Sequence, residues 1–434
     1  MRGMGELEDR RLHFIAIGGA GMSGLALVCH ELGARVSGSD RAASEYLERL
    51  RAAGIEARVG HDADAVPADA EVVVSTAVPD DNPELVRARE RGQRVLHRGE
   101  LLAELCGRGR LLAVAGTHGK TTTTGMLVHA LRALGADPTF FIGGELPGAG
   151  PDGGPANAGA GRGEWVVAEA DESDASFLRL RPEVAVVTNV ELDHHARWSS
   201  QAELADAFRR FLEPARGVAL PPELEDLAPA GAELERFEPG RPGPKRLELP
   251  VPGAHNRLNA RAALAALRLA GFEPEAAARA LAGFPGMRRR QELRGERAGA
   301  RIYDDYAHHP TEVRATLTAL RELGPRRLIA IFQPHLYSRT RALAAQFGAA
   351  LAEADAIGVL DVYAAREEPV GELAGVSGLD VARAAAERAG GKPVWWLRDL
   401  ATAERFLAPR LGSGDLLVTL GAGDIHRLAA ALAE

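Results

Sequence analysis

Short apolar runs recur along the whole chain, and stretches with helical spacing separate them. The first run covers residues 12–17 and is typical of a buried strand. Runs of the same kind lie at residues 34–38, 71–76, 111–115, 164–168, 184–188, 301–305, 327–332, 356–360 and 416–420. Between them, segments such as 126–131 have the spacing of a helix. This alternation predicts parallel sheets of the α/β class.

The runs group into three α/β blocks in series. We place the blocks at residues 1–105, 106–286 and 287–434. Two segments lack clear periodicity: residues 143–163, rich in Gly, Pro and Ala, are expected to form a mobile loop, and residues 214–252, rich in proline and acids, are expected to be irregular.

The second block opens on the sequence GTHGKTTT at residues 116–123, between an apolar run and a helical stretch. This order of strand, glycine turn and helix predicts a phosphate-binding loop. Its lysine, Lys120, is one of only three in the chain, with Lys245 and Lys392. Retention of lysine in so arginine-rich a chain suits a compact charge between phosphates. Val114 stands where the usual pattern has its first glycine, so a Gly/Thr-rich turn with a chance lysine is the alternative.

The first block carries a second glycine-rich turn directly after its first strand. The sequence GGAGMSG at residues 18–24 contains the spacing G-x-G-x-x-G, and Asp40 follows the second strand. Together these features favour a Rossmann-like domain that binds the diphosphate of a nucleotide. The motif alone leaves two other interpretations open, which are an NAD-dependent dehydrogenase and a turn without a ligand.

Acidic residues follow two strands of the second block. The sequence EADESD occupies residues 169–174, and NVELDHH occupies residues 189–195. Since oxygen ligands suit Mg²⁺, these strand ends predict a magnesium site near the phosphate loop. The alternative is that the acids are solvated loop residues and helix caps.

Composition narrows the function further. The 434 residues are enough for two or three domains, and no apolar run approaches the roughly 18 residues of a membrane span. A net charge of −8 argues against binding to nucleic acid. With only two cysteines, Cys29 and Cys106, and no recognisable signal peptide, we expect a cytoplasmic protein that acts away from the membrane.

Beyond the two glycine turns and EADESD, further motifs complete a resemblance across nearly the whole chain. They are SGSD at 37–40, PGAHNRLNA at 252–260, DDYAHHPTE at 304–312 and FQPH at 332–335. In this order they resemble the Mur ligase family. Within the family they are most similar to the ligases that join L-alanine to UDP-N-acetylmuramate in peptidoglycan synthesis. The resemblance implies a Rossmann-like UDP-binding domain, a central domain like a P-loop ATPase and a Rossmann-like C-terminal domain.

The resemblance also implies the chemistry. ATP with Mg²⁺ would phosphorylate the muramate carboxylate, and the amine of L-alanine would attack the resulting acyl phosphate, so that ADP and phosphate leave. The implied cofactors are ATP and Mg²⁺, and the implied partners are UDP-N-acetylmuramate and L-alanine, with the protein a monomer or homodimer.

Site residues follow from the matched motifs. Residues implied for catalysis are Lys120, His194, Asp305, His308 and Arg339. Residues implied for ATP are Gly116, Thr117, His118, Gly119, Lys120, Thr121, Thr122, His255, Asn259 and Arg289. Those for the sugar nucleotide and the amino acid are Gly19, Ala20, Gly21, Met22, Ser23, Ser39, Asp40, Tyr306, His308 and Arg339, and the implied Mg²⁺ ligands are Thr121, Glu169 and His194.

The chain departs from the family pattern at a few positions. Leu336 replaces a usual arginine, Ala196 a usual aspartate and Arg366 a usual glycine. Two rival functions therefore stay open beside alanine ligation. One is a sibling ligase that attaches a recycled peptide to the same sugar nucleotide, and the other is a UDP-sugar binder without catalysis. Either Arg339 or Arg341 could have taken over the role of the missing arginine.

Overall fold

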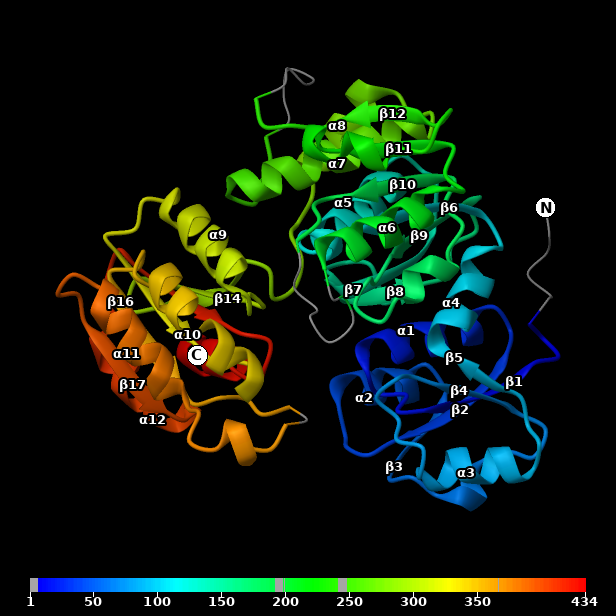
Figure 1. Ribbon diagram of the computed structural model, residues 1–434, viewed down its shortest axis with the longest axis horizontal. Helices are drawn as coiled ribbons and strands as arrows, with labels where there is room; N and C mark the ends of the chain where they lie inside the picture. Colours follow the sequence, from blue (N-terminus) through cyan, green and yellow to red (C-terminus); the bar gives the residue numbers. More distant parts are fainter. Residues whose placement is uncertain (1–6, 192–197, 199, 241–247, 366) are drawn as a thin grey trace. The chain divides into compact units, whose positions relative to one another are not determined.

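The computed structural model describes residues 7–191, 198, 200–240, 248–365 and 367–434. The chain forms two compact units (Figure 1). Unit 1 comprises Met1–Leu249 and Leu258–Phe284, and unit 2 comprises Pro250–Arg257 and Pro285–Glu434. The described residues form three mostly parallel sheets with interspersed helices, which confirms the predicted α/β class.

The first sheet lies in unit 1 and has the order β3-β2-β1-β4-β5, with every neighbouring pair parallel. Its strands are β1 (Arg11–Ile15), β2 (Arg35–Asp40), β3 (Glu56–Val59), β4 (Glu71–Val74) and β5 (Val95–His97). Its helices are α1 (Ala20–Glu31), α2 (Glu45–Ala52), α3 (Pro83–Glu90) and α4 (Arg98–Cys106). The strand order reverses beside β1, and sheets of this topology bind ligands at the carboxyl ends of the strands flanking that point.

The second sheet also lies in unit 1 and has the order β12-β11-β10-β6-β9-β7-β8, with only the β7–β8 pair antiparallel. Its strands are β6 (Arg110–Ala115), β7 (Thr139–Leu146), β8 (Ala156–Gly159), β9 (Trp165–Glu169), β10 (Val184–Val187), β11 (Gly217–Leu220) and β12 (Glu233–Arg236). Its helices are α5 (Lys120–Ala133), α6 (Gln201–Leu212), α7 (Ala254–Leu269) and α8 (Pro274–Ala282).

Two predictions about irregular segments were wrong in part. Residues 143–163 supply the end of β7 and all of β8, and residues 214–252 supply β11 and β12. These strands are short, and their sequences carry little alternation of their own. They are formed by pairing with neighbouring strands, which periodicity along the chain does not report.

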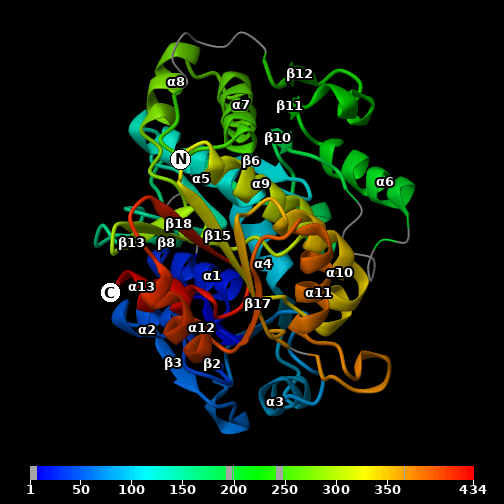
Figure 2. The ribbon, with the colours of Figure 1, turned by 90° about the vertical axis from the view of Figure 1, so that its left-hand side faces the viewer.

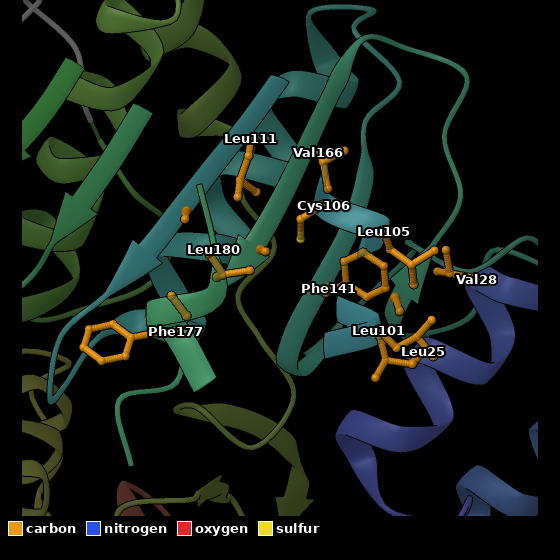
Figure 3. Close-up of a cluster of buried hydrophobic side chains, with 14 of the residues drawn as sticks. Leu25, Val28, Leu101, Leu105, Cys106, Leu111, Phe141, Val166, Phe177 and Leu180 are labelled. Atoms are coloured by element: carbon orange, nitrogen blue, oxygen red, sulfur yellow. The ribbon is translucent and has the colours of Figure 1, made fainter. Parts of the chain in front are cut away.

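A continuous apolar core joins the first two sheets. It includes Leu25 and Val28 from α1, Leu105 from α4, and Phe141 and Val166 from the second sheet (Figure 3). The approach is close, because a Cβ atom added to Gly24 would lie 2.9 Å from the Cβ atom of Ala158 on β8. The first two blocks therefore belong to one body, although the sequence had presented them as separate. The boundaries 1–105, 106–286 and 287–434 remain a prediction.

The third sheet forms unit 2 and has the order β13-β14-β18-β15-β16-β17, with only the β13–β14 pair antiparallel. Its strands are β13 (Glu292–Arg297), β14 (Ala300–Asp305), β15 (Arg327–Phe332), β16 (Ala356–Leu360), β17 (Val394–Arg398) and β18 (Asp415–Leu420). Its helices are α9 (Pro310–Arg321), α10 (Tyr337–Leu351), α11 (Gly378–Arg388), α12 (Leu400–Leu407) and α13 (His426–Ala433). Figure 2 shows α10 and α11 on one side of the sheet and α12 and α13 on the other, where separate apolar cores cover the two faces.

Short 3₁₀ helices complete the described secondary structure: η1 (Ala63–Ala65), η2 (Ser176–Arg179), η3 (Pro222–Leu227), η4 (Gly371–Leu373) and η5 (Ala408–Arg410). None of the helices in the described part of the chain has the length and apolar character needed to cross a bilayer. Cys29 and Cys106 are both buried and carry free thiols.

Candidate active site

The predicted phosphate loop joins β6 to α5. The strand ends at Ala115 and the helix begins at Lys120, which confirms the expected order of strand, turn and helix. Two glycines make this turn possible, since Gly116 and Gly119 have φ values of +131° and +83°. At Gly116 any side chain is also excluded by space, because an added Cβ atom would lie 2.1 Å from Thr188 Oγ1.

Residues at the end of β10 hold the loop in place. The His118 N–H donates to Asn189 Oδ1 at 2.9 Å, and Asn189 Nδ2 donates to the His118 carbonyl at 2.9 Å. Thr188 Oγ1 donates to the same carbonyl at 2.6 Å. Neither Thr188 nor Asn189 was among the predicted site residues. Their position at the carboxyl end of the strand beside β6 was the signal that could have identified them.

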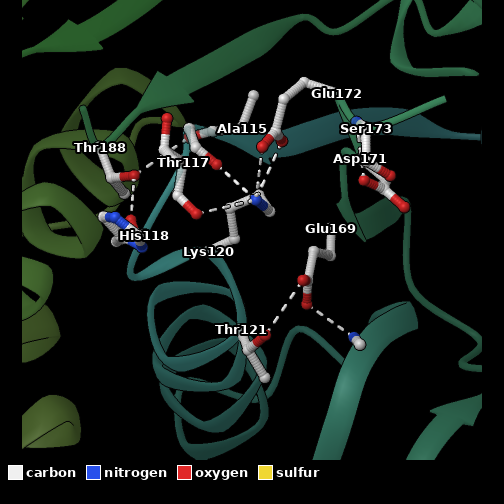
Figure 4. Close-up of polar contacts among 12 residues, drawn as sticks. Ala115, Thr117, His118, Lys120, Thr121, Glu169, Asp171, Glu172, Ser173 and Thr188 are labelled. Atoms are coloured by element: carbon white, nitrogen blue, oxygen red, sulfur yellow. Dashed lines mark hydrogen bonds and ion pairs between the residues drawn. The ribbon is translucent and has the colours of Figure 1, made fainter. Parts of the chain in front are cut away.

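The ammonium group of Lys120 is hydrogen-bonded to acceptors of the protein itself. It donates to the carbonyls of Gly116 and Thr117, and it lies 2.9 Å from Glu172 Oε2 (Figure 4). Burial lowers the pKa of Lys120, but the charges of Glu172 and Glu169 more than offset burial, so the pKa lies above its usual value. An ammonium group has three N–H donors, so a phosphate must replace one of these partners to bind Lys120.

Glu172 is the main residue of this site that the sequence did not single out. Its side chain is 2% exposed, and it approaches Lys120 across 52 positions of sequence. Trp198 Nε1 donates to the Glu172 carbonyl at 3.1 Å, which holds the backbone of this residue. The sequence placed Glu172 within an acidic stretch, and only the fold shows which of those acids faces the lysine.

Thr121 and Glu169 form the described part of the predicted metal site. Thr121 Oγ1 donates to Glu169 Oε1 at 3.0 Å, and the Gly143 N–H donates to Glu169 Oε2 at 2.6 Å. A hydroxyl and a carboxylate beside a phosphate loop fit Mg²⁺, which is commonly bound by one or two protein oxygens together with phosphates and water. The third predicted ligand, His194, lies outside the described residues. Within the described residues no group of three or more His, Cys, Asp and Glu side chains could hold a metal ion by itself.

Asn259 on α7 lies against the phosphate loop. A Cβ atom added to Gly119 would stand 2.5 Å from Asn259 Oδ1, so the amide borders the turn that leads into α5. The structure thus brings Asn259, Gly119 and Lys120 together in unit 1. His255, four residues earlier on the same helix, belongs to unit 2.

The glycine loop of the first block presents its backbone at the surface. Gly19 and Gly21 are exposed, and α1 begins between them at Ala20. Met22 and Ser23 are each 4% exposed, so these two predicted substrate residues are buried at the start of α1.

Asp40 braces this loop from the end of β2. Asp40 Oδ2 accepts the Gly18 N–H at 2.9 Å, and Ser44 Oγ donates to the Gly18 carbonyl at 3.2 Å. Ser39 beside it faces inward instead. It is 1% exposed, and its hydroxyl donates to the buried carboxylate of Glu84 at 2.5 Å. Of the two adjacent candidates, Asp40 therefore contacts the loop and Ser39 supports the sheet.

In unit 2, Asp305 ends β14 and is 3% exposed. It accepts the Gln291 and Ala307 N–H groups at 2.9 and 2.8 Å, and Thr316 Oγ1 lies 3.2 Å from it. Burial raises the pKa of Asp305 to about 6, although Arg290 and the two backbone hydrogen bonds lower it. Through these contacts Asp305 stabilises the turn that carries Tyr306 and His308.

The raised pKa makes a testable contribution to stability. Burial favours the protonated form of Asp305. The contribution of this residue to the free energy of unfolding is therefore complete below about pH 4 and is lost as the pH rises through 6. The change amounts to about 3 kcal/mol. Asp305→Asn does not titrate. We expect the free energy of unfolding of the wild type to fall relative to this variant between pH 4 and 7, measured by hydrogen exchange of β14 amides. Parallel pH profiles would contradict this expectation.

Arg289 is tied to protein acceptors. Its Nε donates to the buried Asp304 Oδ2 at 3.1 Å, and its Nη2 donates to the Gly421 carbonyl at 2.8 Å. The guanidinium carbon lies 5.0 Å from the centroid of the Tyr306 ring. Arg289 therefore links β14 to the loop after β18 and supports the predicted substrate residue Tyr306.

Aromatic and imidazole rings form a row at this end of the third sheet. The ring centroids of Tyr306 and His308 are 5.3 Å apart, those of His308 and His335 are 6.1 Å apart, and those of His335 and Tyr363 are 5.8 Å apart. Burial is the main cause that lowers the pKa of His308. The charge of Glu312 raises this pKa, and the charge of Arg339 lowers it. His335 and Tyr363 were not predicted as site residues, although His335 follows a strand end.

The contacts of His308 decide which ring nitrogen carries the proton when the imidazole is neutral. Its Nδ1 lies 3.1 Å from the Tyr306 carbonyl oxygen, which can only accept a hydrogen bond. The proton of the neutral ring therefore resides on Nδ1, and Nε2 is an acceptor. Burial lowers the pKa of His255 to about 4, and its Nε2 lies 3.0 Å from Gln291 Nε2.

Comparison with known proteins agrees with this architecture. Residues 11–110 match the family described as Mur ligase family, catalytic domain, residues 114–220 match the Mur ligase middle domain, and residues 289–423 match the Mur ligase glutamate ligase domain. The chain is 45% identical to the UDP-N-acetylmuramate–L-alanine ligase of Rubrobacter xylanophilus, over 96% of this chain and 98% of that protein. It is 48% identical to the protein of the same name from Kineococcus radiotolerans, over 96% and 94%.

Comparison with solved structures also finds ligases of this kind. The UDP-N-acetylmuramate–alanine ligase of Thermotoga maritima has a TM-score of 0.81 and 29% identity, covering 97% of this chain and 98% of that one. A murein peptide ligase of Psychrobacter arcticus has a TM-score of 0.72 and 25% identity, covering 98% and 99%. These matches confirm the three-domain α/β architecture and the ligase class that the motifs implied. The chain belongs to the Mur ligase family.

Proposed function

We propose that this protein joins L-alanine to the carboxylate of UDP-N-acetylmuramate and cleaves ATP to ADP and phosphate. A carboxylate oxygen of the sugar nucleotide attacks the γ-phosphorus of ATP, and ADP leaves. The amine of L-alanine then attacks the carbonyl carbon of the acyl phosphate. The amide bond forms, phosphate departs, and the amine loses its proton. Positioning of mutually repelling anions is the principal demand of such a reaction.

The observation that carries the proposal is the presence of two different nucleotide loops in one compact unit. A glycine loop opens α1, and a phosphate loop with a partly buried lysine opens α5. A dehydrogenase needs only the first loop, so the second favours transfer of a phosphoryl group. Identity of 45% to an L-alanine ligase over 96% of this chain supports the same substrates.

Named residues of unit 1 have specific roles in this proposal. Lys120 exchanges a protein acceptor for a phosphate oxygen and neutralises charge that develops during transfer. Thr121 and Glu169 would hold Mg²⁺, which shields the phosphates from one another when bound. The exposed glycine loop at Gly19 and Gly21 would receive the diphosphate of the sugar nucleotide, as the start of a helix favours anions.

Unit 2 supplies the residues proposed for the amino acid, and Arg339 is the arginine best suited to replace the one missing at Leu336. Arg341 donates to the Glu372 carbonyl and carboxylate at 2.8 and 2.9 Å, whereas the charge of Arg339 acts on His308. We expect Arg339→Ala to raise KM for L-alanine or the sugar nucleotide by about 10- to 100-fold, the range for a charge-assisted hydrogen bond. Arg341→Ala is the matched control and should leave both KM values within about twofold, as for exposed ion pairs.

Leu336→Arg gives an independent measure of the same assignment. Leu336 has φ +69° and precedes α10, where its carbonyl accepts the Thr340 N–H and hydroxyl. If Arg339 already serves the substrate, a second cation adds nothing, and steady-state KM values should stay flat or rise. A lower KM would show instead that the site lacks a cation.

The direct test is phosphate release with ATP, Mg²⁺ and UDP-N-acetylmuramate, with each candidate amino acid added separately. We expect release to depend on L-alanine, with L-serine and glycine used less well. Release that requires a tripeptide would favour a recycling ligase, an alternative consistent with the similarity to the murein peptide ligase. Absence of turnover with any of them, despite binding of the UDP-sugar, would leave a non-catalytic binder. We propose a cytoplasmic location, since both thiols are free, as is usual in a reducing compartment.

A further inference from the structure

One acidic segment in unit 1 contacts residues beside both nucleotide loops. Glu169 and Glu172 in this segment contact Thr121 and Lys120 of the phosphate loop. Between and after them, Asp171 and Asp174 lie 3.3 and 2.6 Å from Nη2 of Arg98, at the start of α4. Figure 4 shows that Glu172 is directed at Lys120, whereas the adjacent Asp171 extends away from it. Residues 169–174, named here the acidic segment, therefore have two sets of partners.

Arg98 also lies against the glycine loop. A Cβ atom added to Gly21 would stand 3.4 Å from Arg98 Nη1, the nitrogen that does not contact the two aspartates. The side chain of Arg98 is 22% exposed and that of Asp174 is 14% exposed, so these contacts are only partly screened by solvent. The guanidinium thus offers one nitrogen to the acidic segment and the other to the loop, which a planar fork of five N–H donors allows.

Resting on the function proposed above, we propose that Arg98 is a positioning residue that couples the sugar-nucleotide site to the ATP site through Asp171 and Asp174. The ligand that it recognises at the loop is the diphosphate group of the sugar nucleotide. Nη1 donates to that diphosphate while Nη2 keeps its contacts with the aspartates.

The coupling is positive, for a physical reason. A diphosphate that anchors Arg98 also orders the acidic segment, which carries Glu169 and Glu172 at the phosphate loop. The second ligand then meets a segment that is already ordered, and it binds more tightly because less conformational entropy is lost. By linkage the effect is reciprocal, so each nucleotide improves the affinity of the other by the same factor.

Calorimetry of the full-length protein tests the proposal without turnover. ADP with Mg²⁺ is titrated in the absence and presence of saturating UDP-N-acetylmuramate, and the reverse titration is also made. For the wild type we expect each ligand to strengthen the other by about 5- to 150-fold, the usual range for coupled sites. Arg98→Met should bind the UDP-sugar about 10- to 100-fold more weakly and should abolish the coupling.

Three further variants separate coupling from stability. Arg98→Lys keeps the charge but has a single nitrogen, so it should retain part of the UDP-sugar affinity and lose the coupling. Asp174→Asn should retain UDP-sugar affinity and reduce the coupling. Arg179→Met is the matched control. Arg179 pairs at 3.2 Å with Glu100, which lies on the same helix α4 as Arg98, and it has no part in the proposed coupling. It should behave as the wild type.

The outcomes are distinct. Independent or antagonistic binding of the two nucleotides by the wild type would overturn the proposal, as would undiminished coupling in Arg98→Met or lost coupling in Arg179→Met. If Arg98→Met fails to fold, Arg98→Lys and Asp174→Asn decide by the same criterion. Failure of the wild type to bind either nucleotide would count against the proposed function itself, whereas coupled binding without L-alanine-dependent turnover would leave the role of Arg98 intact.

Discussion

Lys120→Ala is expected to lower kcat by about 10³-fold, a loss typical of removing one charge-stabilising donor from an active site. Affinity for the sugar nucleotide measured without ATP should stay close to that of the wild type, because the glycine loop is formed by other residues. The structure adds a second consequence. Without the lysine, the carboxylate of Glu172, which is 1% exposed, loses its ion-pair partner. Breaking a buried pair in this way costs about 3–5 kcal/mol of stability.

A double substitution separates the two effects. Lys120→Ala combined with Glu172→Gln removes both charges, so we expect it to regain much of the free energy of unfolding while turnover stays low. Urea unfolding and phosphate release, measured on the same preparations, give the comparison. Near-normal ligation by Lys120→Ala would rule out the assigned role, and recovery of turnover in the double variant would show that the single variant had failed through instability.

Glu169→Gln is expected to raise the Mg²⁺ concentration needed for half-maximal activity by about 10- to 100-fold or more, since even residues that only orient metal ligands have effects of this size. Both carboxylate oxygens of Glu169 accept hydrogen bonds, from the Thr121 hydroxyl at 3.0 Å and from the Gly143 N–H at 2.6 Å. Glutamine has one oxygen, so its NH₂ group must face one of these donors. The substitution therefore removes a charge and also disturbs the geometry of the site.

Mg²⁺ titrations of the initial rate at fixed ATP would measure this effect. Glu164→Gln is the matched control, because Glu164 immediately precedes β9 while Glu169 ends it. The Glu164 side chain is 64% exposed and pairs at 3.1 Å with Arg110, which begins β6, whereas the phosphate loop follows the other end of that strand. Superimposable titrations of Glu169→Gln and the wild type would refute the ligand assignment, and an equal shift in Glu164→Gln would make it nonspecific.

The strands and the glycine turns could be predicted from the sequence because local interactions determine them. The runs predicted at residues 111–115 and 184–188 correspond to β6 and β10, in the middle of the second sheet. The glycines of the phosphate loop were placed correctly for the same reason, since positive φ at Gly116 and Gly119 excludes most other residues. The class of fold and the two nucleotide loops could thus be inferred without coordinates.

Other features depend on partners that are remote in sequence. Glu172 contacts Lys120 across 52 positions, and Asn189 contacts His118 across 71 positions. Among the acids of residues 169–174, nothing local distinguishes the one that pairs with the lysine from those that pair with Arg98. Likewise, β11 lacks strong alternation and is formed because the neighbouring strand β10 offers hydrogen bonds.

The sequence alone was sufficient for the α/β class, for the two glycine loops and for a ligase resemblance, because short-range spacing and backbone sterics specify these features. Tertiary structure was needed to show that the first two blocks share one core, that Ser39 faces the sheet interior and that Glu172 engages Lys120. It was also needed to find Arg98 between the glycine loop and the acidic segment. The physical reason is that burial and charge pairing depend on which surfaces meet when the chain folds, and a one-dimensional pattern does not contain that information.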